Sequence, residues 1–187
     1  MNETLFHFVN QFAGSNGFLD DTMKFFAGKL VWVMIGIMAV LWFTGKLENQ
    51  RIAFNSVLTA MLALGIGMFV IGPMIDHPRP FVSLTVNQLI THDADPSFPS
   101  DHSTFAFSLA FAAFLIKRKI GSVLLVLAAL TGIGRVFVGV HFPFDVMGGM
   151  VLALICAFIV HILHRQTEPA LKWCVRLYRK VTFQRQA

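Results

Sequence analysis

The architecture of this chain is decided by residues 120–163, IGSVLLVLAALTGIGRVFVGVHFPFDVMGGMVLALICAFIVHIL. Its two apolar runs, 120–138 and 144–163, each have about the 20 residues that a helix needs to cross a bilayer. Charged and ionisable groups nevertheless lie where the runs meet: Arg135, His141 and Asp145. Because such groups are costly at the edge of hydrocarbon, their presence there indicates a functional site.

The composition of the whole chain is typical of a membrane protein. Of its 187 residues 56% are hydrophobic and only 13% are charged, whereas soluble domains carry about 25% charged residues. Further apolar runs occupy 23–44, 52–75 and 100–116. A soluble protein with buried helices is the alternative, but runs of this length favour a bilayer. We expect one domain, residues 1–187, with an all-α fold: a polytopic membrane helical bundle with about five transmembrane helices.

Amphipathic segments flank this predicted bundle. Residues 2–13 indicate a short N-terminal helix with an apolar side, formed by Leu5, Phe8, Val9 and Phe12. Residues 81–91 are expected to form a short interfacial helix. The C-terminal tail has one apolar helical face, formed by Leu171, Cys174, Val175 and Tyr178. Its other face is basic, which is typical of an interfacial helix on an anionic leaflet; a frayed basic tail is the alternative.

The distribution of Lys and Arg predicts the orientation. The net charge is +5, and the excess lies in short loops and in the tail, so an anionic membrane face is a simpler partner than nucleic acid. Cytoplasmic loops are enriched in Lys and Arg. We therefore expect a multi-pass plasma-membrane protein whose cytoplasmic side carries the C-terminus and these basic residues: Lys46, Arg51, Lys117, Arg118, Lys119, Arg165, Lys172, Arg176, Arg179, Lys180 and Arg185.

Two further motifs lie at the predicted outer ends of the runs. Pro99-Ser100-Asp101-His102 opens the run 100–116, and Arg79-Pro80 follows the run 52–75. Ser or Asp at the start of a helix is a common N-cap, and the free amides of a helix N-terminus bind anions. Capping alone would explain Ser100, but it does not require His102 in the first turn.

The junction residues also have simpler interpretations. Arg135 could merely extend toward the interface, and Asp145 could merely cap the run 144–163. Their grouping with His141 in one short turn favours chemistry instead. A carboxylate bonded to one imidazole nitrogen fixes the tautomer and leaves the other nitrogen as base or nucleophile. Together with the two arginines, these groups are suited to bind a phosphate and attack it.

The three motifs together resemble the type 2 phosphatidic acid phosphatase superfamily. Its pattern is Lys-x6-Arg-Pro, then Pro-Ser-x-His, then Ser-Arg-x5-His-x3-Asp. The present motifs match in order and spacing over about residues 65–160, except that Gly72 replaces the Lys and Gly134 replaces the first Ser. The small size and the Pro-Ser-Asp-His motif are most similar to the branch of BcrC-type undecaprenyl-diphosphate phosphatases.

The resemblance implies a function and a role for each motif residue. It implies hydrolysis of undecaprenyl diphosphate to undecaprenyl phosphate and inorganic phosphate at the outer face of the bacterial membrane, with no cofactor and no metal. This reaction recycles the lipid carrier of cell-wall synthesis. His141 would attack phosphorus with Asp145 orienting it, and His102 would protonate the leaving oxygen and then activate water. The groups that would bind the substrate are Arg79, Ser100, Asp101 and Arg135.

Three other functions remain open at this point. A phosphatase could act on phosphatidylglycerophosphate or phosphatidate-type lipids instead. His102, His141 and Asp145 could ligate zinc, although the neighbouring arginines would repel a cation. A small transporter could also carry charged groups in its pathway, but transporters favour midplane sites and internal repeats.

The charge pattern predicts the topology directly. A reporter fused after Gln186 should be cytoplasmic, and a reporter inserted near Ala94 should be external, because basic loops stay on the cytoplasmic side. Paired alkaline phosphatase and green fluorescent protein fusions would measure this. The opposite labelling would place the motif residues on the inner face.

Overall fold

The structure of the chain, a computed structural model, describes residues 1–182, and every regular element in that range is a helix. Arg185 of the predicted basic tail lies outside the described residues. The elements are α1 (Asn2–Asn10), α2 (Gly17–Lys24), η1 (Phe25–Lys29), α3 (Leu30–Phe43), α4 (Leu47–Ile66), η2 (Gly67–Ile71), α5 (Gly72–Ile75), α6 (Pro80–Ser83), α7 (Asp101–Ile116), α8 (Arg118–Phe137), α9 (Pro143–Ile162) and α10 (His164–Val181).

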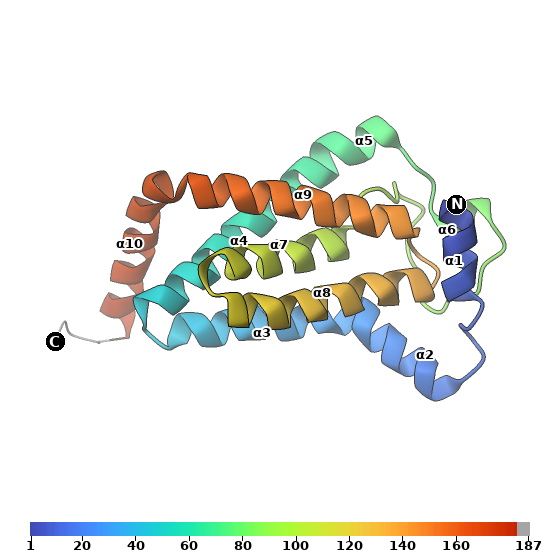
Figure 1. Ribbon diagram of the computed structural model, residues 1–187, viewed down its shortest axis with the longest axis horizontal. Coiled ribbons are helices and arrows are strands. Elements are labelled where there is room, and N and C mark those ends of the chain that lie inside the picture. Colours follow the sequence, from blue (N-terminus) through green and yellow to red (C-terminus); the bar gives the residue numbers. More distant parts are fainter. Residues whose placement is uncertain (183–187) are drawn as a thin grey trace.

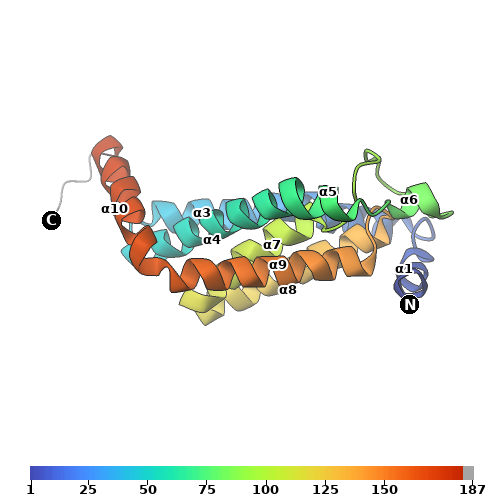
Figure 2. The same ribbon diagram turned by 90° about the horizontal axis from the view of Figure 1, so that it is seen from above.

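The predicted membrane helical bundle is confirmed. Four helical segments of the described chain are long and apolar enough to cross a membrane: Gly17–Phe43, Leu47–Ser83, Arg118–Phe137 and Pro143–Ile162. The remaining predicted span, 100–116, coincides with α7, which is apolar but shorter. The long helices run side by side along one axis (Figures 1 and 2). Helix α7 packs against α4, α8 and α9.

Small residues allow α7 to be the central helix. Ala106, Ala110 and Ala113 on α7 are completely buried. Close approach of backbones through small residues is the usual means of helix association in membranes. Gly149 on α9 shows how close the helices come, because a Cβ there would lie 2.6 Å from Oγ1 of Thr104 on α7. This contact places the start of α9 beside the start of α7.

Helix α1 packs across one end of the bundle (Figure 1). Phe6 is completely buried and packs edge-on against Phe142. The Asn10 side chain donates hydrogen bonds to the carbonyls of Asn87 and Phe137. Of the predicted apolar side, Leu5, Phe8 and Phe12 are exposed, whereas Val9 is partly buried and packs against the core. Helix α1 therefore joins the bundle through Phe6, Val9 and Asn10.

The prediction of a helix over residues 81–91 is wrong. The only helix in this region is α6, whose four residues end at Ser83, and Leu84 is already extended. The following segment binds other parts of the chain through its backbone: the amide of Leu89 donates to the carbonyl of Val138, and the amide of Asn87 donates to the side chain of Asn10. These partners satisfy backbone groups that a helix would have satisfied internally.

The basic C-terminal helix is confirmed as α10. Leu171 and Val175 on its apolar face are buried against the bundle. Helix α10 crosses the bundle at a steep angle, at the end opposite α1 (Figures 1 and 2). An amphipathic helix in this orientation is suited to lie at the membrane interface.

Candidate active site

The motif residues gather at the end of the bundle that carries α1. Arg79 precedes α6, Ser100 is the N-cap of α7, and Asp101 and His102 form its first turn. Arg135 lies in the last turn of α8, His141 in the loop that follows, and Asp145 in the first turn of α9. Because α7 and α9 begin at this end and α8 finishes there, residues 66 positions apart in sequence share one site.

Five of these side chains are almost inaccessible. The exposed fractions of Arg79, Arg135 and His141 are 2%, that of Asp145 is 1%, and Ser100 is completely buried. Burying arginines and a carboxylate carries a large desolvation cost unless each finds partners. The partners therefore reveal how the site is organised.

Asp145 is held by two donors on different segments. The Ser97 hydroxyl and the amide of Phe142 both donate to its Oδ2, the latter at 2.8 Å. The second bond closes the first turn of α9, so Asp145 is also the cap that its position suggested. His141 lies next to the same oxygen, with 3.6 Å between Nδ1 and Oδ2.

The tautomer of His141 follows from its neighbours. Nδ1 lies 3.0 Å from the carbonyl oxygen of Ser97, which can only accept, so Nδ1 carries the proton. This differs from the expected direct hydrogen bond to Asp145, because the Ser97 carbonyl takes that place. Nη1 of Arg79 lies 3.1 Å from Nε2, and a guanidinium can only donate. Nε2 therefore presents its lone pair toward the arginine.

Burial lowers the pKa of His141 well below its ordinary value, and the positive charges of Arg135 and Arg79 lower it further. The imidazole is therefore neutral at pH 7. A neutral imidazole whose Nε2 carries no proton can act as a nucleophile or a base once the Arg79 donor moves from Nε2 to a bound anion.

Arg79 and Arg135 differ in how fully they are bonded. Arg79 donates through Nε to Asp95 Oδ1 at 3.0 Å and through Nη1 to the carbonyl of Val140 at 3.1 Å. Nε and Nη2 of Arg135 are buried without a hydrogen-bond partner within the described part of the chain. Buried donors of a charged group are almost always satisfied in a functional state. These two nitrogens therefore mark an open anion site.

The start of α7 supplies further polar groups. No cap bond from the Ser100 side chain is found at the N-terminus of α7; instead the Ser100 hydroxyl accepts a hydrogen bond from Ser103 at 3.1 Å. Asp101 and His102 line a groove of about 320 Å³ whose other walls are apolar. We call it the α3–α4 groove, and its remaining lining residues are Val31, Trp32, Ile35, Leu64, Met68 and Phe105.

Three residues of the site were not singled out from the sequence. Ser97 bonds Asp145, Asp95 bonds Arg79, and the His92 ring lies edge-on to His141 with 6.2 Å between ring centroids. Their only sequence signal is a polar loop directly before the Pro99-Ser100 motif. Sequence spacing alone does not show that this loop folds over the histidine.

The two glycine departures differ in the space around them. A Cβ at Gly134 would lie 2.7 Å from the backbone nitrogen of Ala27, so η1 occupies the space of the expected serine side chain. A Cβ at Gly72 would lie 3.2 Å from the carbonyl oxygen of Gly67, which is tight without excluding a side chain. The His77 ring lies near Asp145, with 3.8 Å between Nδ1 and Oδ1.

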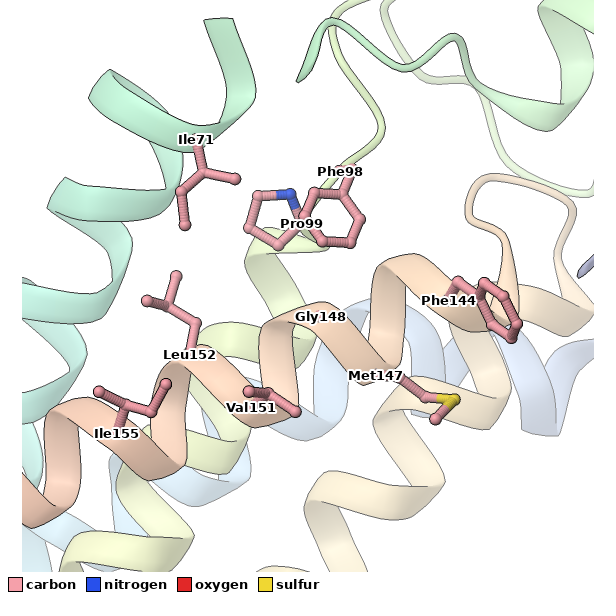
Figure 3. A pocket seen from close by; sticks show the side chains of 9 residues that line it. All are labelled: Ile71, Phe98, Pro99, Phe144, Met147, Gly148, Val151, Leu152 and Ile155. Atoms are coloured by element: carbon pink, nitrogen blue, oxygen red, sulfur yellow. The ribbon is translucent and has the colours of Figure 1, made fainter. Parts of the chain in front are cut away.

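A second, larger groove of about 480 Å³ runs along α9, and we call it the α9 groove. Figure 3 shows its walls: Ile71 of η2, the Phe98-Pro99 segment, and a row of side chains on α9 that includes Met147, Val151 and Ile155. The Phe98-Pro99 segment joins Ser97 to Ser100. The site is therefore flanked by apolar surface on two sides.

Comparisons with known proteins identify the family of this chain. A profile of the PAP2 superfamily matches residues 53–168. The chain is 33% identical to undecaprenyl-diphosphatase BcrC of Bacillus subtilis (strain 168), over 97% of this chain and 93% of that protein. It is 34% identical to the putative undecaprenyl-diphosphatase YbjG of Escherichia coli (strain K12), over 83% and 78%. The crystal structure of Aquifex aeolicus LpxE is similar with a TM-score of 0.67 and 28% identity, over 85% of this chain and 93% of that one. The chain therefore belongs to the PAP2 superfamily and is a membrane-embedded hydrolase.

Proposed function

We propose that this protein hydrolyses undecaprenyl diphosphate to undecaprenyl phosphate and inorganic phosphate at the outer face of the bacterial membrane. The observation that carries the proposal is the buried pair of unpartnered Arg135 nitrogens beside a neutral histidine. A phosphoryl group bound there would satisfy both nitrogens. The relatives named as undecaprenyl-diphosphatases support a lipid diphosphate as the substrate.

The first step is attack on the terminal phosphorus. His141 Nε2 forms a bond to phosphorus while the bond from phosphorus to the bridging oxygen breaks. Arg79, Arg135, the Ser100 hydroxyl and the amides that begin α7, Asp101 among them, bind the phosphoryl oxygens. Fixed positive charge directed at developing negative charge is the main source of acceleration in phosphoryl transfer. The Nδ1 proton stays on the imidazole, bonded to the Ser97 carbonyl and stabilised by Asp145.

His102 acts as the general acid of the first step and as the general base of the second. It donates a proton to the bridging oxygen as that oxygen leaves with the lipid monophosphate. It then takes a proton from water, whose oxygen attacks phosphorus and breaks the bond to His141 Nε2. Inorganic phosphate and the free imidazole result. Because Arg79 Nη1 already lies 3.1 Å from Nε2, the position in front of the nucleophile favours an anion over a metal ion.

The position of His102 also indicates where the lipid tail lies. The oxygen that His102 protonates belongs to the lipid product, so the tail must begin next to His102. His102 lines the α3–α4 groove, whose other walls are mostly apolar side chains. We assign the first isoprene units to this groove. An apolar chain of this kind gains about 0.8 kcal/mol for each CH₂ that it buries.

A substrate panel tests the proposal. Purified protein should release phosphate from undecaprenyl diphosphate at least about tenfold faster, by kcat/KM, than from phosphatidylglycerophosphate or phosphatidate. The diphosphate carries more charge for the arginines and amides to bind. A strong chelator should leave the rate unchanged. Faster cleavage of the glycerophospholipids would contradict the substrate, and activity lost on chelation and restored by zinc or magnesium would contradict the mechanism.

The proposed intermediate gives a second prediction. With substrate labelled in the terminal phosphate, His102→Ala should slow both steps but should accumulate labelled protein that is stable to alkali and labile to acid. The lipid monophosphate is a good leaving group even without a proton donor, whereas water attacks slowly without a base. His141→Ala should show no label and should lose at least about 10³-fold in kcat. Asp145→Asn should lose less, since the imidazole remains.

Quenched-flow labelling followed by gel autoradiography would measure the intermediate. His161→Ala is the matched control, because His161 is exposed and belongs to no part of the site. Near wild-type turnover in His141→Ala would exclude it as the nucleophile.

The arginines give a third prediction. Arg135→Lys and Arg79→Lys should each lower kcat/KM by about 10²-fold, because an ammonium keeps the charge but cannot present two parallel donors. Steady-state kinetics on undecaprenyl diphosphate would measure the loss, with the exposed Arg118→Lys as a control. Full activity of both variants would place phosphate recognition elsewhere.

A further inference from the structure

A groove lined by basic residues lies at the end of the bundle opposite the proposed active site. It has a volume of about 650 Å³ and lies between α10 and the start of α4. We call it the cationic groove, and its lining residues are Leu47, Arg165, Glu168, Pro169, Lys172, Val175, Arg176 and Arg179. None of these residues takes part in the proposed reaction.

The groove is a fixed feature because α10 is anchored to the bundle. One nitrogen of Arg51 on α4, Nη2, donates to both carboxylate oxygens of Glu168 on α10, at 2.9 and 3.0 Å. Leu171 and Val175 bury their side chains beneath the helix. Tyr178 packs edge-on against Trp42 at the end of α3, with 6.1 Å between ring centroids. These contacts hold both walls of the groove in place.

The charges in the groove are unbalanced. Four cations line it, and its single carboxylate, Glu168, already pairs with Arg51 and lies 3.8 Å from Lys172. Among the described residues, Arg165, Arg176 and Arg179 form no ion pair within 4 Å. An excess of positive charge in a concave site favours an anionic ligand.

The position of the groove identifies the kind of anion. The membrane-crossing helix α9 ends at Ile162, and α10 begins two residues later and turns across the bundle (Figure 1). The groove therefore lies where an apolar span meets the polar headgroups. Its lining also includes Leu47 and Val175, which offer apolar contact next to the cations. A ligand with a phosphate and an adjoining apolar chain matches both features.

We propose that the cationic groove binds the headgroup phosphate of one anionic phospholipid of the leaflet at this end of the bundle. Its volume falls within the range of about 300–1,000 Å³ that is usual for small-molecule sites. Arg176 and Arg179 bind the phosphate, while Arg51 keeps Glu168 from repelling it. A lipid bound here is distinct from the substrate and contacts α10 and α4 together.

Lipid titration of the purified full-length protein tests this proposal. Native mass spectrometry in a neutral detergent would count the bound lipids, with phosphatidylglycerol or phosphatidylcholine as the probe. We expect one phosphatidylglycerol to bind at least about tenfold more tightly than phosphatidylcholine, since basic residues near the headgroups attract a lipid with a net negative charge. The double variant that combines Arg176→Gln and Arg179→Gln should reduce this preference to less than about threefold.

The matched control removes the same charge from the same end of the bundle. Arg118 and Lys119 are exposed in the first turn of α8, and the neighbouring Lys117 pairs with Glu48 of α4. Arg118→Gln with Lys119→Gln should keep the full preference for phosphatidylglycerol. Equal loss in both double variants would show that only diffuse charge attracts the lipid and would overturn the site. An unchanged preference for phosphatidylglycerol in the double variant of Arg176 and Arg179 would also overturn the site. Phosphatase turnover of the Arg176 and Arg179 double variant in neutral detergent should be unchanged. This measurement separates a failure of the lipid site from a failure of the proposed reaction.

Discussion

The buried carboxylate of Asp145 joins the parts of the active end into one structure. Its Oδ2 accepts hydrogen bonds from the Ser97 hydroxyl and from the amide of Phe142, and its backbone carbonyl accepts one from the amide of Ser100. The segment before α7, the turn after α8 and the start of α9 therefore meet at one residue. Removing one partner of a buried charge costs several kcal/mol, so these segments depend on one another.

The same arrangement sets the protonation of the proposed nucleophile. The carbonyl of Ser97 accepts a hydrogen bond from Nδ1–H of His141, and Arg79 lies next to Nε2. Burial and two arginines keep the ring neutral. The positive charge needed to hold a phosphate thus also keeps the histidine nucleophilic. In water the arginines would have little effect on the protonation of the ring, but in a buried site their electric field is only weakly screened.

The two ends of the bundle use basic residues in different ways. At the active end, Arg79 and Arg135 are buried, and the guanidinium of Arg79 contacts a neutral histidine. At the opposite end, the basic residues of α10 stay accessible around the cationic groove and balance only one carboxylate. Desolvation explains the difference, because a buried arginine needs a bound anion to complete its bonding, whereas an exposed one is already solvated.

The sequence by itself determined the membrane bundle, the positions of the three motifs along it and their placement at one end of that bundle. Long apolar runs have few alternatives to helices in a bilayer, and the spacing of the motifs relative to those runs is countable. Only the tertiary structure decided that Ser97, Asp95 and His92 join the site, that residues 84–91 are not helical, and that α1 packs through Phe6, Val9 and Asn10. These features depend on contacts between segments far apart in the chain, such as Asn10 with Phe137 and Gly134 with Ala27. Local residue patterns carry no information about such contacts, because the energy of each one comes from the partner that folding brings to it.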